Sequence, residues 1–125
     1  MEGALKTAVL QAAWAARDFL AFAAKAADEG RMSVDEAVEL LEQVKKMTTQ
    51  LADAAQHDDN AAPRPVMTLL RDCLVDLEAL SHLGDLLQQY ETTPLNAFRM
   101  AEACRYTARR VVGELACIEH MLLDL

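Results

Sequence analysis

Apolar residues recur every three or four positions along four long stretches of this 125-residue chain, which is the spacing of one face of an α-helix. The stretches are separated by short segments that carry the signals for helix ends and helix starts. The chain has only four Gly and three Pro, too few for a turn-rich β fold, whereas Ala, the best helix former, is abundant. The sequence therefore predicts one all-α domain over residues 1–125, an antiparallel four-helix bundle made of two helical hairpins.

The first two helices are expected to form one hairpin. The first should run from about Ala4 to Ala27 and end at Gly30, since Gly readily adopts the left-handed conformation that closes many helices. The second should open at Ser33, because Glu36 follows three residues later in the spacing of a capping box. Helical spacing predicts that these residues face the core: Leu5, Val9, Ala12, Ala16, Phe19, Ala23 and Ala26 in the first helix, and Val34, Ala37, Leu41, Val44, Thr48, Leu51 and Ala55 in the second.

The last two helices are expected to form the other hairpin, after a linker from His57 to Pro65 in which two prolines prevent a continuous helix. The third helix should run from about Val66 to Tyr90. Thr93 is a suitable N-cap and Pro94 a suitable first helical residue for the fourth, which should run to about Leu123. The expected core residues are Val66, Leu70, Cys73, Leu77, Leu80, Gly84 and Leu87 in the third helix, and Phe98, Ala101, Cys104, Ala108, Val111, Leu115 and Leu122 in the fourth.

The first and third helices also carry apolar residues on the face opposite their predicted core. These are Leu10, Ala13, Trp14 and Ala21 on the first helix, and Val75, Ala79 and Leu86, with His82 among them, on the third. Such residues either widen the buried arc of a helix or form an interface, and we favour an interface because isolated monomers rarely expose contiguous apolar patches. The residues expected to bind a partner here are Leu10, Trp14, Arg17, Ala21, Val75, His82 and Leu86.

Trp14 is the most informative of these residues. Arg17 follows it by three positions, and Trp and Arg are over-represented among the residues that dominate binding energy at interfaces. We therefore expect a contact surface on the first helix, most simply in a homodimer, with the outer face of the third helix as a second candidate.

The fourth helix carries Arg105 and Arg109, which share one helix edge and repel each other unless an acidic group faces them. In an antiparallel hairpin, Asp76 should lie level with about Ala108. The spacing predicts a salt bridge from Asp76 to one of the two arginines inside the bundle; the alternative is a basic edge at which Arg105 and Arg109 bind an acidic group of a partner.

Patterns for metal, cofactor or nucleophilic chemistry are weak. No Glu precedes a His by three residues, as a di-iron bundle requires, and no Gly-rich phosphate loop is present. Glu78 and His82 share a helix face, and Cys117 with His120 is at most half of a zinc site. The leading hypothesis is therefore a non-enzymatic regulatory, inhibitory or adaptor protein without cofactor or metal. The alternatives are a bundle that binds a small ligand or metal through Glu78, His82 and Cys117, and an enzyme dependent on the Cys117 thiol.

The net charge of −8 disfavours binding to nucleic acid, and no stretch approaches the length of a membrane span. Three cysteines without paired spacing argue against a disulfide framework and for a reducing, cytoplasmic location. The frequent Ala and Arg are typical of a bacterium or its phage with GC-rich DNA. The expected partner is another protein, with no nucleic acid, membrane or small-molecule substrate.

Overall fold

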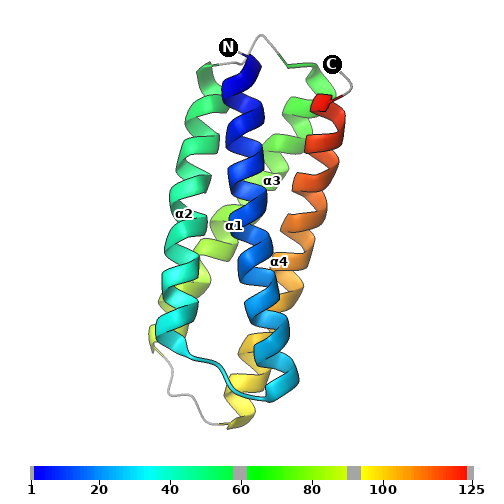
Figure 1. Cartoon of the computed structure of the whole chain (residues 1–125). Helices are drawn as coiled ribbons and strands as arrows, with labels where there is room; N and C mark the ends of the chain where they lie inside the picture. The colour runs from blue at the N-terminus through cyan, green and yellow to red at the C-terminus, as the bar shows by residue number, and fades with distance from the viewer. Residues whose placement is uncertain (1, 58–61, 90–93, 124–125) are drawn as a thin grey trace.

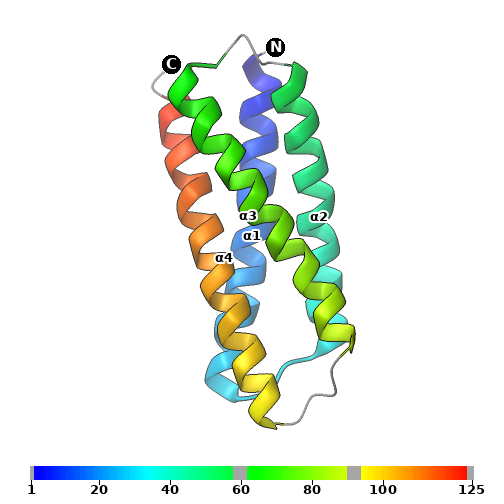
Figure 2. The same cartoon turned by 180° about the vertical axis from the view of Figure 1, so that it is seen from behind.

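The computed structural model describes residues 2–57, 62–89 and 94–123, and these form four helices (Figure 1). They are α1 (Glu2–Glu29), α2 (Val34–His57), α3 (Arg64–Gln89) and α4 (Pro94–Leu123). The helices alternate in direction along the chain, so the start of α1 and the end of α4 lie at the same end of the molecule. Both α1 and α3 pack against α2 and α4, which places α1 and α3 diagonally across the bundle (Figure 2). The predicted antiparallel four-helix bundle of two hairpins is confirmed.

The turn between α1 and α2 contains the two signals that the sequence predicts. Gly30 has a φ of 68°, and the N–H of Arg31 donates to the carbonyl of Ala26 at 3.2 Å, which closes α1 in a Schellman arrangement. The Ser33 hydroxyl accepts a hydrogen bond from the N–H of Glu36 at 3.4 Å and caps the start of α2. A tight, capped turn follows, and it holds the two helices antiparallel.

Helix α3 begins at Arg64, earlier than the linker prediction allows. Pro65 lies within its first turn, where a backbone N–H has no helical partner and its absence costs nothing. The N–H of Met67 already donates to the carbonyl of Pro63 at 3.1 Å. Helix α4 begins at Pro94 as expected, whereas the Thr93 cap and Tyr90, the expected end of the third helix, lie outside the described residues.

The predicted core is largely confirmed. Every expected core residue of α1 and α3 is buried, as are those of α4 apart from Phe98. Phe98 is 45% exposed, and the inward-facing Ile118, which the prediction omitted, is fully buried. In α2, Val34 and Thr48 are only partly buried, at the edge of the interior. The apolar spacing therefore predicts the inward direction of each helix. The exception is Phe98, near the start of α4, which was expected in the core but is exposed.

Helix α3 crosses the bundle obliquely (Figure 2). Its first turns lie beside the end of α4, whereas its last turns lie beside α2. Gly84 marks this approach to α2, because a Cβ added there would lie 3.5 Å from the Cδ1 atom of Leu41, an ordinary van der Waals contact. The oblique path leaves the last turns of α3 and the first turns of α4 less closely packed than the middle of the same helix pair.

Candidate binding surfaces

The outer face of α1 carries an exposed tryptophan. Trp14 is 61% exposed, Leu10 is half-buried one turn before it, and Ala21 is exposed two turns after it. Leu123, at the end of α4, is 69% exposed and lines a small cavity of about 60 Å³ together with Leu10. We call Leu10, Trp14, Arg17, Ala21 and Leu123 the α1 surface. It spans two helices that are far apart in sequence but adjacent in the bundle.

Leu123 was missed by the sequence prediction. Its signal was the topology rather than any motif, because antiparallel packing of α1 and α4 brings the last turn of α4 beside the first turns of α1. Ala13 is a correction in the other direction. It was expected to face outward but is 1% exposed, since it lies on the same side of α1 as Leu10 and Arg17, the side that meets α4.

Arg17 fastens the edge of the α1 surface to α4. Its Nη2 atom lies 3.4 Å from Oε2 of Glu119, and the two side chains are 44% and 26% exposed. A pair this exposed contributes little stability, on the order of 1 kcal/mol or less. Arg17 is thus held in place by Glu119 while a large part of its guanidinium surface stays accessible.

The outer face of α3 carries the second predicted set of residues. Val75 is 64% exposed, and His82 and Leu86 are exposed on the same helix. Nε2 of His82 lies 3.8 Å from Oε1 of Glu78, and Nδ1 of His82 lies 3.8 Å from Oδ2 of Asp85. These contacts are ion pairs only when the imidazole is protonated. Because α1 and α3 are diagonal, this α3 surface (Val75, Ala79, His82 and Leu86) lies on the opposite side of the bundle from the α1 surface.

The predicted salt bridge of Asp76 is wrong in its partner. Asp76 pairs with Arg110, Oδ2 to Nε at 3.3 Å, whereas Arg105 pairs within α4 with Glu102 at 2.8 Å. Arg109 is exposed and makes no ion pair with another described residue. Arg110 faces α3 through Asp76, and at 100° per residue Arg109 and Arg105 project about 100° and 140° away from Arg110 on α4. The predicted register of α3 against α4 is nearly right, since Asp76 was expected level with about Ala108 and pairs with Arg110. The prediction chose the wrong edge of α4 for the arginine.

Glu114 joins Asp76 and Arg110 in one cluster between α3 and α4. Its Oε1 atom is buried without a hydrogen bond and lies 3.5 Å from Nε of Arg110. Burial, the hydrogen bond that protonated Glu114 donates to Asp76, and the negative charge of Asp76 raise the pKa of Glu114 to about 7, against a lowering effect of Arg110. The repulsion between the carboxyl groups of Asp76 and Glu114 is thus reduced by the Arg110 cation and, at acidic to neutral pH, also by the proton on Glu114.

Burial of Cys73 and Cys104 disfavours the thiolate form in which a cysteine reacts. Burial, with smaller contributions from Glu114 and Asp76, raises the pKa of Cys73 to about 12, and burial raises that of Cys104 to about 11. Cys117 is exposed on α4. Because Asp76 is level with Arg110 to Glu114, His82 is level with about residues 104–108, and Cys117 lies roughly 14–20 Å further along the bundle at 1.5 Å per residue. The ligand set Glu78, His82 and Cys117 is thus not brought together, and within the described part of the chain no three such side chains are placed to hold a metal ion.

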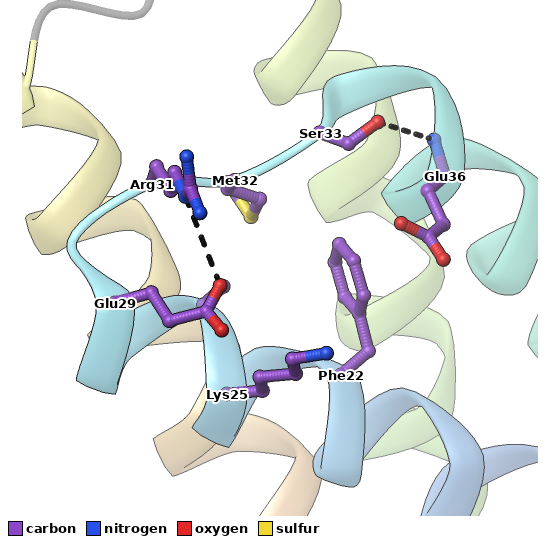
Figure 3. A pocket seen from close by; sticks show the side chains of 8 residues that line it. Phe22, Lys25, Glu29, Arg31, Met32, Ser33 and Glu36 are labelled. Atoms are coloured by element: carbon purple, nitrogen blue, oxygen red, sulfur yellow. Dashed lines mark hydrogen bonds and ion pairs between the residues drawn. The ribbon is translucent and has the colours of Figure 1, made fainter.

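A pocket of about 340 Å³ lies at the turn between α1 and α2 (Figure 3). Phe22 extends from α1 between Met32 and the capped start of α2. The charged residues that line the pocket are Lys25, Glu29, Arg31 and Glu36. Nε of Arg31 lies 3.9 Å from Oε2 of Glu29. Because the two signs balance, the pocket offers no net charge to a ligand.

A second cavity, of about 370 Å³, lies between the last turns of α3 and the first turns of α4. We call it the α3–α4 groove; it is lined by Leu83, Leu86, Leu87, Arg99, Met100, Ala103 and Cys104. Six of these seven residues are apolar or carry a neutral thiol, and the seventh is a cation. The groove is where α3 diverges from α4, so it follows from the crossing of the two helices.

Comparison of the chain with protein-family models, with curated proteins and with solved structures found no match. Within the described residues, none of the four helices has an apolar run long enough to cross a lipid bilayer. The candidate surfaces must therefore be judged on their own geometry.

Proposed function

We propose that this protein is a non-enzymatic regulatory or adaptor protein that binds another protein molecule through the α1 surface. The observation that supports it is the exposure of Trp14, 61% of whose surface meets solvent between Leu10 and Ala21. An exposed indole ring gains no burial free energy in the monomer, whereas Trp is among the side chains that contribute most binding energy at interfaces. The rim of mixed charge around it, Arg17 and Glu119 included, is typical of such surfaces.

The partner that fits this face most simply is a second copy of the chain. An interface with twofold symmetry must be self-complementary, and the outer side of α1 carries charges of both signs, among them Arg17, Asp18 and Lys25. In an antiparallel pairing of α1 with its symmetry mate centred between Arg17 and Asp18, Trp14 lies opposite Ala21 of the other copy. The small Ala21 side chain leaves the space that the indole ring fills.

Sedimentation equilibrium of the wild type and of Trp14→Ala tests this proposal. The wild type should dimerise, and the substitution should weaken the dimer by about 2 kcal/mol, or roughly 30-fold, with the helical circular dichroism unchanged. Tyr106→Ala is the matched control, since Tyr106 is an aromatic residue 72% exposed on the outer face of α4. It should leave the dimer intact.

A wild type that stays monomeric at high concentration would overturn the homodimer. Binding of a different protein is then tested by presenting wild type, Trp14→Ala and Tyr106→Ala as baits to a cell extract. The α1 surface is supported only if a captured protein is lost with Trp14→Ala and retained with Tyr106→Ala. Loss with Val75→Glu instead would assign the binding to the α3 surface. The three cysteines without disulfides support a reducing, cytoplasmic setting as part of the same proposal.

A further inference from the structure

The α3–α4 groove is separate from the α1 surface and has a different chemical character. Its walls are Leu83, Leu86 and Leu87 from α3, and Met100 and Ala103 from α4. Its volume of about 370 Å³ falls in the range of small-molecule pockets, roughly 300–1,000 Å³. An apolar wall of this size gains free energy when an apolar chain displaces water from it.

The groove is too short to hold a helix of a partner protein. The lining residues span 83–87 on α3 and 99–104 on α4, which is about 6 to 8 Å of each helix axis at 1.5 Å per residue. A docked helix uses anchors at i, i+3, i+4 and i+7, and therefore needs about 10 Å or more of continuous groove. A single alkyl chain is much narrower than a helix and bends at each C–C bond, so it can fill this short volume in a folded conformation.

Arg99 is the charged residue of the groove, and its charge is not neutralised by another described residue. It is exposed and makes no ion pair with the described part of the chain. Glu102, the carboxylate one turn further along α4, is 2.8 Å from Arg105 and is therefore engaged elsewhere. Among the described residues, no acidic side chain lines the groove. In a chain whose net charge is −8, this local surface is complementary to an anion.

We propose that the α3–α4 groove binds a medium-chain fatty carboxylate, with the alkyl chain against Leu83, Leu87 and Met100 and the carboxylate on the Arg99 guanidinium. A guanidinium presents parallel N–H donors that match the two oxygens of a carboxylate. The alkyl chain supplies the affinity through burial, and Arg99 supplies the preference for an acid over a neutral molecule of the same length. This site does not depend on the α1 surface or on the oligomeric state of the protein.

The test is a titration of the full chain, labelled with ¹³C at the methionine methyl groups, with decanoate and with decanol. Both probes should shift the Met100 methyl resonance, and decanoate should bind more tightly. Arg99→Gln should weaken decanoate about tenfold and leave decanol within about twofold. Arg109→Gln is the matched control, because Arg109 is an exposed arginine on the same helix that does not line the groove.

Ala103→Phe tests the apolar wall. The new ring should fill the groove and abolish binding of both probes, whereas Ala116→Phe, at an exposed alanine elsewhere on α4, should leave binding unchanged. Ala103 is exposed, so the fold should tolerate the change, and an unaltered unfolding midpoint will confirm this. The proposal is overturned if neither probe shifts Met100, if Arg99→Gln weakens both probes equally or neither, or if Ala103→Phe binds them like the wild type. None of these outcomes bears on dimerisation through Trp14.

Discussion

Helix α4 packs between α1 and α3, and its two interfaces differ in the size of the side chains that form them. The buried residues of α1 include many alanines, among them Ala12, Ala13 and Ala16, whereas those of α3 are mostly larger and include Leu77 and Leu80. Small side chains let two helices approach closely and stay close along their length. Larger ones hold the axes apart, and α3 crosses α4 obliquely (Figure 2).

The consequence of this difference is that the two interfaces use their polar groups and free space differently. On the α1 side, one exposed pair, Arg17 with Glu119, lies at the edge. On the α3 side, Asp76, Arg110 and Glu114 lie between the helices, and the groove opens where α3 leaves α4. The interface with α1 therefore leaves only a small cavity beside Leu10 and Leu123, whereas the interface with α3 leaves room for a titrating cluster and a candidate ligand site.

The largest expected effect separates the packed and open parts of α3. Leu80 is fully buried, so Leu80→Ala should lower the free energy of unfolding by about 2–5 kcal/mol. Leu86 is 44% exposed at the groove, and Leu86→Ala should cost about 1 kcal/mol or less. Urea unfolding of both variants measures the difference. Equal losses would mean that the last turns of α3 are as closely packed as its middle.

The next effect tests the alanine interface. Ala13→Leu inserts a larger side chain where α1 meets α4 and should cost about 1–3 kcal/mol, since the close approach leaves no space for it. Ala21→Leu adds the same atoms on the exposed side of the same helix and should change the stability of the monomer by less than about 0.5 kcal/mol. If Ala13→Leu were as stable as the wild type, the two interfaces of α4 would be packed alike.

The same contrast explains how much the sequence revealed. Spacing within one helix identifies its inward direction, and for that reason the cores of α1 and α3, the Gly30 helix end and the Ser33 cap were predictable. Spacing does not say which neighbour covers each flank. Ala13 was therefore expected in water, though α4 covers it, and Phe98 was expected in the core although it is 45% exposed.

The candidate sites divide in the same way. The exposure of Trp14, Val75 and Leu86 follows from the helical wheel of each helix alone. Three features depend on the crossing angle and rotation of two helices: the pairing of Asp76 with Arg110, the cavity that Leu10 and Leu123 both line, and the α3–α4 groove. Those quantities are set by side-chain packing across the interface, which a periodicity of one helix does not contain.

A smaller effect concerns the pH dependence of the α3–α4 cluster. The pKa of Glu114 rises from 4.5 in the unfolded chain to about 7 in the folded protein. Between these two pH values the folded state therefore keeps a proton on Glu114 that the unfolded state has lost. Its contribution to stability is fully present below pH 4.5 and is lost as the pH rises through about 7. Between pH 5 and pH 8 the wild type should lose on the order of 1 kcal/mol relative to Glu114→Gln, which keeps the shape without the ionisation. Parallel slopes of unfolding free energy against pH for the two proteins would contradict this assignment.

The smallest effects compare two cross-helix ion pairs of α4, Arg17 with Glu119 and Arg110 with Asp76. Arg17→Gln removes an exposed pair at the edge of the alanine interface and should cost about 0.5 kcal/mol or less at any pH between 5 and 8. Arg110→Gln removes the cation that lies between Asp76 and Glu114, whose side chains are only 23% and 17% exposed. At pH 8 both carboxylates are charged, and the loss should reach about 1 kcal/mol. At pH 5 Glu114 is protonated and can donate to Asp76, so the same substitution should cost less.

Unfolding free energies of Arg17→Gln and Arg110→Gln at pH 5 and pH 8 measure this difference. A pH-independent cost for Arg110→Gln would show that the cluster behaves like the surface pair on the other side of α4, and the distinction between the two interfaces would then be one of packing alone.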